Sequence, residues 1–223
     1  MKIRTGFVSN SSSSSFVVAF PHEPDGVQDL HRMLFGDNER HEIVSRYNYP
    51  GDTPISSELA AAFLWERILD QREMTPERRA QEIRDGITGE EYLTTNADLQ
   101  ALLPFGPSDG ADAALWQRCC REIEAGKDRT DLVAALCGKE PKCEMFTRLG
   151  DSKIDETWAT YFSKTDALDA VLDAAQMRKV LSELSPGVAL YSFNFSDHES
   201  GVEGVLESST VFDGVKHWYL SNH

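Results

Sequence analysis

Residues 6–20 of the chain read GFVSNSSSSSFVVAF, in which five consecutive serines stand between two apolar segments. The second apolar segment, residues 16–20, is short and built from aromatic, β-branched and small residues, and Pro21 follows it. A run of this kind between polar residues and a breaker is typical of a buried strand. We therefore predict a core strand over residues 16–20 and build the rest of the fold around it.

Two further strand patterns lie at the other end of the sequence. Residues 188–195 alternate in character and place Tyr191, Phe193 and Phe195 on one side, which predicts a strand with one aromatic face. Residues 215–220 alternate as well and predict a last strand. Strand patterns thus occur at both ends of the chain, and helical patterns fill the part between them.

This distribution predicts the α+β fold class. We expect a small, mostly antiparallel sheet built from the N- and C-terminal segments and covered by a mainly helical middle. We also expect a single domain over residues 1–223, with the helical middle at about residues 26–184 inserted between the terminal strands.

The helical middle contains several local signals. Ser56 is placed to cap a helix, and Asn96 and Thr130 are placed to cap two later ones. The apolar period over residues 165–184 slips near Gln176, which predicts a bend or break there. The helix after Ser56 has an apolar stripe formed by Leu59, Phe63, Leu64, Ile68 and Leu69.

The serine run, residues 9–15, has three interpretations. Serine-rich tracts are usually flexible linkers, because they cannot bury apolar surface. Alternatively, the run is a folded loop whose hydroxyls bond to backbone groups, or a ligand loop whose N–H and O–H groups bind an anion. It matches neither the phosphate-binding pattern G-x-x-x-x-G-K-[ST] nor the nucleophile elbow G-x-S-x-G. Because it directly precedes a predicted core strand, we expect the run to be ordered.

The opening of the chain, MKIRTGFVSNSSSSSF, resembles the N-terminal signature K-I-R-x-G-F-V-S-N-S-S-S-S-S-F of an uncharacterised group of bacterial and phage-type proteins. The ending HWYLSNH, residues 217–223, is similar to the tail of such proteins. The resemblance implies that the serine run is not a random linker. It implies no activity, cofactor or catalytic residue.

If the terminal strands share one sheet, the serine run and the C-terminal strand come close together. The candidate ligand-binding residues on this hypothesis are Arg4, Ser9, Asn10, Ser11, Ser12, Ser13 and His217. Asp197, His198, His217 and His223 are of the types that bind metals and transfer protons, but their spacing matches no known ligand pattern. We expect no metal here and identify no catalytic residue.

The four cysteines, at positions 119, 120, 137 and 143, form no C-x-x-C pattern. Irregular spacing of this kind favours reduced, partly buried thiols over a zinc site. We therefore expect no structural zinc.

Composition limits the possible partners. Of the 223 residues, 40% are hydrophobic and 26% charged, as in ordinary globular proteins. The net charge of −15 argues against nucleic-acid binding through phosphate neutralisation and suits a protein partner with a basic face. No apolar run reaches the ~20 residues of a membrane span, and the serine run interrupts any signal-peptide core. We expect a cytoplasmic protein with no membrane segment.

Two classes of function fit these observations. The first is a soluble intracellular binding or interaction protein without a cofactor. The alternative is a small-molecule enzyme or anion-binding protein that uses the serine loop, residues 9–15, together with the C-terminal histidines. We favour the first class, because the sequence contains no recognisable catalytic constellation.

Overall fold

The chain folds into two compact units. The first consists of Met1–Ile87 and Leu184–His223, and the second of Thr88–Glu183. The computed structural model describes residues 13–37, 42–45, 53–88, 92–107, 111–141, 151–196, 201–207 and 210–221. The expectation of a single domain over the whole chain stays a prediction.

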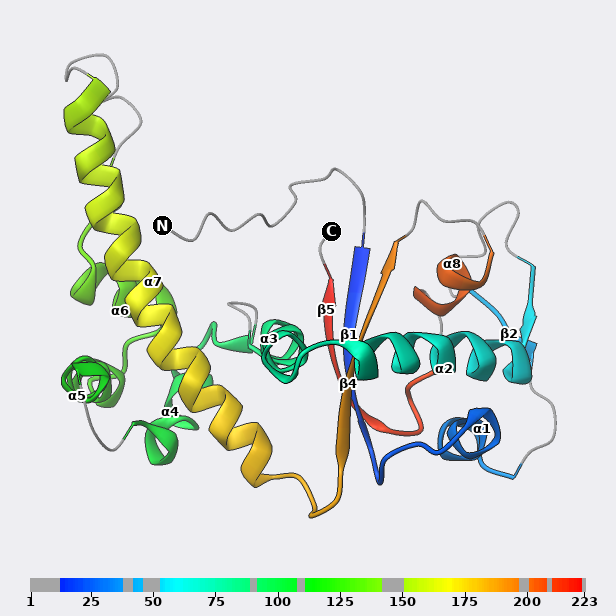
Figure 1. Cartoon of the computed structure of the whole chain (residues 1–223). Helices are drawn as coiled ribbons and strands as arrows, with labels where there is room; N and C mark the ends of the chain where they lie inside the picture. Colours follow the sequence, from blue (N-terminus) through cyan, green and yellow to red (C-terminus); the bar gives the residue numbers. More distant parts are fainter. Residues whose placement is uncertain are drawn as a thin grey trace. The chain divides into compact units, whose positions relative to one another are not determined.

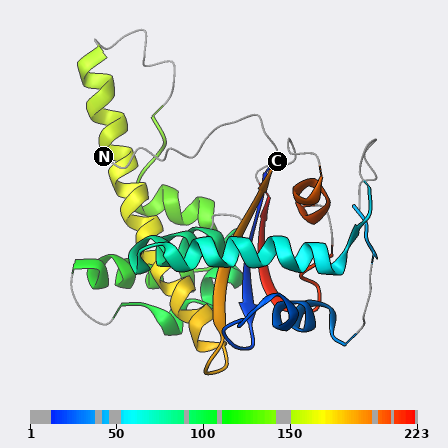
Figure 2. The same ribbon diagram turned by 45° about the vertical axis from the view of Figure 1, so that its right-hand side comes forward.

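A three-stranded antiparallel sheet organises the first unit (Figure 1). The strands β4 (Ala189–Ser196) and β5 (Lys216–Ser221) lie on either side of β1 (Ser13–Phe20). Figure 2 shows the same three strands side by side from a second direction. The predicted α+β class, with a small antiparallel sheet built from N- and C-terminal segments, is therefore confirmed. The structure adds the strand order, which places β1 at the centre.

Aromatic rings fill one face of this sheet. Phe16 lies opposite Phe193 in the register, and the ring of Phe212 stands 5.1 Å from Phe16 and 5.4 Å from Phe193. Tyr191, Phe193 and Phe195 are all buried, as the alternation of their strand predicts. Large rings of this kind provide most of the apolar area in a small core.

Helices and a small second sheet pack on this aromatic face. The helices are α1 (Val27–Phe35), α2 (Ser57–Glu73) and α8 (Val202–Glu207). The second sheet pairs β2 (Glu42–Ile43) with β3 (Ile55–Ser56). Ser56 caps α2, as predicted, by accepting a hydrogen bond from Leu59 N at 3.2 Å.

The helix α3 (Pro76–Ile87) contacts all three strands of the sheet. Gly86 allows its close approach, because a Cβ added there would lie 2.5 Å from Cγ2 of the fully buried Val17. Val17 alternates with the core-facing Phe16 and Val18, so α3 covers the face of the sheet opposite the aromatic core.

The second unit is helical over its described residues. Its elements are α4 (Asn96–Gln100), the 3₁₀ helix η2 (Leu103–Phe105), α5 (Ala111–Glu124), α6 (Arg129–Leu136) and α7 (Asp151–Ser182). Side chains of Trp116, Ile123, Leu132 and Leu172 meet in its core. An ion pair from Arg129 to Asp169, with N···O 2.6 Å, joins α6 to α7.

Two helix predictions need correction. In α2, Leu64 and Ile68 are buried, but Leu59 and Leu69 are 48% and 42% exposed, because the buried face turns through Ala60 and Ala61 instead. The predicted break near Gln176 is wrong. The helix α7 continues through it, and its buried face runs on at helical spacing through Leu168, Leu172, Ala175, Gln176 and Val180.

Two of the predicted caps are wrong as well. Thr95 rather than Asn96 caps α4, in a capping box with Asp98, and Asp128 rather than Thr130 caps α6. The Asn96 side chain instead donates hydrogen bonds of 2.9 and 2.6 Å to the carbonyls of Ile123 and Lys127, at the end of α5. Carboxylates and hydroxyls compete for the capping position, and sequence spacing alone does not decide between neighbours.

None of the helices in the described part of the chain combines the length and apolar character needed to cross a membrane.

Candidate functional site

The site predicted from the sequence is only partly visible. Arg4, Ser9, Asn10, Ser11 and Ser12 lie outside the described residues, as do Asp197, His198 and His223. Ser13 begins β1 opposite Ser196. His217 lies opposite Val18, five residues further along β1 than Ser13, which corresponds to about 17 Å of strand. The structure therefore does not bring Ser13 and His217 together.

The surroundings of His217 and Ser14 are those of structural residues. The His217 ring packs 6.2 Å from the rings of Phe16 and Phe212, and its Nδ1 lies 3.1 Å from the carbonyl of Val215. Ser14 is buried and donates a hydrogen bond of 3.1 Å to Glu207. Ser14 is part of β1, where it pairs with Phe195 and Ser221, so this end of the serine run is strand and not loop.

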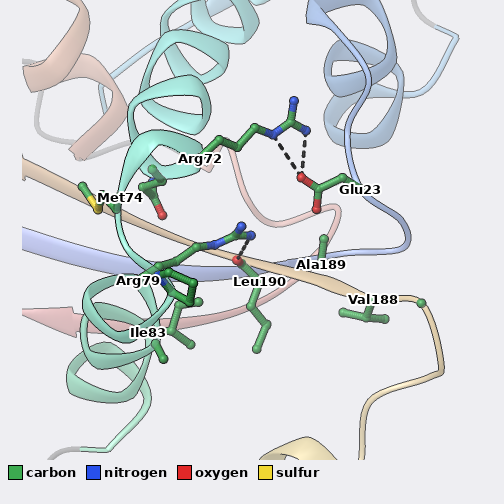
Figure 3. A pocket seen from close by; sticks show the side chains of 12 residues that line it. Glu23, Arg72, Met74, Arg79, Ile83, Val188, Ala189 and Leu190 are labelled. Carbon is green, nitrogen blue, oxygen red and sulfur yellow. Dashed lines mark hydrogen bonds and ion pairs between the residues drawn. The ribbon is translucent and has the colours of Figure 1, made fainter.

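An open hollow of about 580 Å³ lies at the outer edge of β4 (Figure 3). The end of α2, the first turns of α3 and residues 187–190 surround it. Three charged side chains line it, namely Glu23, Arg72 and Arg79. The apolar part of the lining includes Met74, Ile83, Val188 and Leu190.

The hollow borders an edge strand, β4, whose outward backbone groups are not paired with another strand of the sheet. Gln71 of α2 supplies an amide partner, with Nε2 donating to Ser192 O at 2.6 Å and Oε1 accepting from Ser192 N at 3.0 Å. Both backbone groups of Ser192 therefore point away from β1. In an antiparallel strand, the side to which the N–H and C=O of a residue point changes with each residue. Leu190 lies two residues before Ser192, so its N–H and C=O also point outward, into the hollow.

Arg79 reaches this edge from α3. Its guanidinium donates to Leu190 O at 3.1 Å, and its Cζ lies 4.3 Å from the centre of the Tyr191 ring (Figure 3). Among the described residues, no carboxylate lies within ion-pair distance of Arg79. A guanidinium has five N–H donors, so most of the donors of Arg79 are available to a ligand.

Arg72 is in a different situation, because protein groups engage it on several sides. Its Nε donates to Glu23 at 3.0 Å and to the Tyr191 hydroxyl at 3.2 Å, and its guanidinium also binds Pro24 O. Its Cζ lies 4.8 Å from the centre of the Trp65 ring. Burial lowers the pKa of Arg72, but the bonds to Tyr191 and Glu23 outweigh this, so that its pKa is raised.

Tyr191 completes this network. Its hydroxyl accepts from Arg72 and donates to Glu23. Burial raises the pKa of the Tyr191 hydroxyl, and the hydrogen bond to Glu23 adds to the rise, while Arg72 and Arg79 oppose it. A neutral hydroxyl that already donates its proton to a carboxylate is poorly placed to act as a base.

The charges of the hollow therefore do not cancel. Glu23 is paired with Arg72, with N···O 2.8 Å, and the positive charge of Arg79 is left over. In a chain with net charge −15, a local excess of positive charge at a concave surface is an unusual feature. It favours the binding of an anionic group, because opposite charges attract most strongly where solvent is partly excluded.

Other chemical groups in the described part of the chain are less suited to function. Cys119, Cys120 and Cys137 are free thiols, and burial raises the pKa of Cys119 to about 12, which suppresses the reactive thiolate. His31 Nε2 lies 2.8 Å from Ser57 Oγ, but Ser57 is fully buried. No group of three or more metal-binding side chains occurs among the residues the structure describes, and Cys143 lies outside them.

Comparison with known proteins gives no functional information. No protein-family model, curated protein or solved structure matches the chain.

The sequence analysis did not identify Arg79. The adjacent pair Arg78 and Arg79 is common on charged surface helices and indicates little by itself. Helical periodicity is the signal that could have identified Arg79. Arg79, Ile83 and Gly86 are spaced i, i+4, i+7 and share one face of α3. The spacing places Arg79 towards the sheet, whereas Arg78 pairs with Glu82 and is exposed.

Proposed function

We propose that this protein is a binding protein whose ligand carries an anionic group held in the hollow at the edge of β4. Arg79 provides the charge, and the outward N–H of Leu190 provides a second donor. The single observation that carries this proposal is the guanidinium of Arg79, half-buried in a hollow and bonded only to a carbonyl and a ring among the described residues. Charge-assisted hydrogen bonds of this type are stronger than neutral ones.

Binding rather than catalysis is the better-supported activity. The hollow provides donors and positive charge, but its carboxylate, Glu23, is held by Arg72 and Tyr191. The described lining residues include no histidine, cysteine or serine. A general base or nucleophile needs to lie within hydrogen-bond reach of a reacting group. The one carboxylate among the described lining residues already accepts hydrogen bonds from Arg72 and Tyr191 at Oε1.

The composition of the chain supports a proposal for the location and the partner of the protein. We place the protein in the cytoplasm and propose that its acidic surface contacts a protein partner with a basic face, not nucleic acid. The net charge of −15 supports this, since it repels polyanions at long range. Contact with such a partner should weaken as salt is added.

The test is an NMR titration of the ¹⁵N-labelled protein with acetate, phosphate and sulfate as probe anions. We expect the amide signal of Leu190 to shift with at least one of them. Arg79→Gln should weaken this binding about tenfold or more, since a hydrogen bond to a charged group contributes about 1.5–3 kcal/mol. Arg78→Gln is the matched control and should bind like the parent, because Arg78 points to Glu82.

Two results would contradict the proposal. One is the absence of any anion-dependent shift at Leu190. The other is equal weakening of binding by Arg78→Gln and Arg79→Gln, which would indicate a diffuse charge effect and not a site.

A further inference from the structure

The walls of the hollow, together with its charge, narrow the chemical class of the ligand. We infer that the hollow binds an aliphatic monocarboxylate, with the carboxylate at Arg79 and the hydrocarbon chain along the apolar wall. This inference rests on the proposed anion site and adds the class of ligand to it.

The charge of the hollow matches one negative charge. Glu23 already neutralises Arg72, so a ligand meets a single uncompensated guanidinium, that of Arg79. A second negative charge would lie near the Glu23 carboxylate or against apolar side chains, and both positions are unfavourable. Dianions such as phosphate or succinate are therefore poorer matches than a monoanion.

The donors are placed for a carboxylate. Arg79 approaches the β4 edge at Leu190, where it bonds the carbonyl oxygen, and the N–H of the same residue points to the same side. One carboxylate oxygen can accept from Arg79 while the other accepts from the Leu190 N–H. The Leu190 carbonyl, which would otherwise repel an anion, is covered by the guanidinium.

The remaining lining is suited to a hydrocarbon chain. Ile83 is buried, and Met74, Val188 and Leu190 are half-buried, so that apolar surface faces the space beside Arg79 (Figure 3). Its volume of about 580 Å³ is within the range of pockets that take small organic ligands. Each fully buried methylene should strengthen binding about fourfold, and less in an open hollow.

The experiment measures the affinity of the full chain for acetate, butyrate, hexanoate and octanoate by ¹⁵N NMR. Hexanamide serves as the uncharged comparator, and succinate and phosphate as dianions. We expect affinity to rise about two- to fourfold per methylene up to hexanoate. Hexanamide, succinate and phosphate should each bind at least tenfold more weakly than hexanoate.

Variants of the protein test the contributions of the carboxylate and of the hydrocarbon chain separately. Arg79→Gln should weaken hexanoate at least tenfold, and Arg78→Gln should have no effect. Val188→Ser should weaken the binding of hexanoate more than that of acetate, and so reduce the dependence of affinity on chain length. The amide spectrum of each variant shows whether it is folded, and Val188 lies in a turn before β4, where the substitution perturbs no strand pairing.

The source of the carboxylate is tested in the same series. N-acetylleucine represents the carboxyl end of a peptide, and hexanoate represents a free acid. Tighter binding of either one supports the shared chemistry and identifies its source.

Different results would overturn the monocarboxylate inference and the proposed anion site. If anions bind at Leu190 but chain length has no effect, or phosphate binds as tightly as hexanoate, the monocarboxylate inference is overturned and the anion site stands. If no anion of either series shifts Leu190, both are overturned.

Discussion

The two units of this chain solve the problem of backbone hydrogen bonding in different ways. In the second unit, Thr88–Glu183, the described elements are helices, which bond their own backbone groups and leave only their ends to be capped. In the first unit, a sheet leaves the edge of β4 open, and Gln71 and Arg79 reach across from two helices to satisfy it. The candidate binding site arises at that edge.

The two cores also differ in how far apart in the sequence their residues lie. The first unit depends on rings brought together from distant parts of the sequence, with Phe16 between Phe193 and Tyr219 in the register. The second unit packs side chains from one continuous segment. Contacts between distant segments require a larger loss of chain entropy before they form, so the first unit depends more on each of its central elements.

The largest effect should follow from deleting residues 1–20, which removes the central strand. β1 pairs with both β4 and β5 and contributes Phe16, Val17, Val18 and Phe20 to the buried interior. We expect the first unit to lose its cooperative melt and its near-ultraviolet circular dichroism. The second unit should keep its helical signal, because Thr88–Glu183 has its own core.

The control for this deletion is the excised fragment Thr88–Glu183, whose far-ultraviolet spectrum and melt should account for the signal that persists. A truncated chain that melts cooperatively with the parent near-ultraviolet spectrum would show that β1 is dispensable.

Two glycine substitutions compare packing in the two units. A Cβ at Gly106 would lie 1.6 Å from Trp116 Nε1, so Gly106→Ala should displace the indole, destabilise the second unit by about 3 kcal/mol and change tryptophan fluorescence. A Cβ at Gly86 would lie 2.5 Å from a methyl of Val17. There the better helix propensity of alanine offsets part of the clash, and we expect a loss of about 1–2 kcal/mol.

Denaturant titration measures both losses, and Gly26→Ala is the control, because a Cβ at Gly26 meets nothing within 4 Å. If Gly86→Ala is instead more stable than the parent, the close approach of α3 to β1 is not as described.

The smallest effect concerns the capping box of α4 in the second unit. Asp98 Oδ2 accepts hydrogen bonds from Thr95 N at 2.9 Å and from Thr95 Oγ1 at 2.6 Å, and these bonds lower the pKa of Asp98 below its usual 3.8. A lowered folded-state pKa stabilises the fold above the unfolded value, and this stabilisation is lost as the pH falls through the folded value.

We expect Asp98→Asn to cost about 1 kcal/mol at pH 7 and progressively less below pH 4. Stability measured by urea unfolding between pH 2.5 and 7 checks this. The control is Asp112→Asn, at an exposed position in the first turn of α5. A cost for Asp98→Asn that does not vary with pH would show that the carboxylate charge has no part in the cap.

The comparison of the two units also shows where sequence reasoning succeeds. The three strands of the main sheet and the start of α2 at Ser56 were predicted, because each depends on a local pattern or an adjacent breaker. The caps at Thr95 and Asp128 and the continuity of α7 were missed. In each of these cases neighbouring residues offered competing local signals, and tertiary packing selected one of them.

The candidate site, in contrast, was not predicted from the sequence. Of the residues predicted from sequence to bind a ligand, Ser13 and His217 are described, and they lie apart on the sheet. Arg79 and Leu190 belong to segments with no sequence signal in common. They meet because the pairing of β1 with β4 leaves an outer edge that α3 happens to reach.

The sequence by itself determined the fold class and the three strands of the main sheet, because alternation of apolar residues and chain breakers act over a few residues. It also determined the acidic net charge. Only the tertiary structure decided which strand is central, which edge stays open and which arginine lacks a carboxylate partner among the described residues. Those features depend on contacts between segments that are far apart in the sequence, such as the contact of Arg79 with Leu190, which are separated by 111 positions. Local patterns contain no information about such contacts.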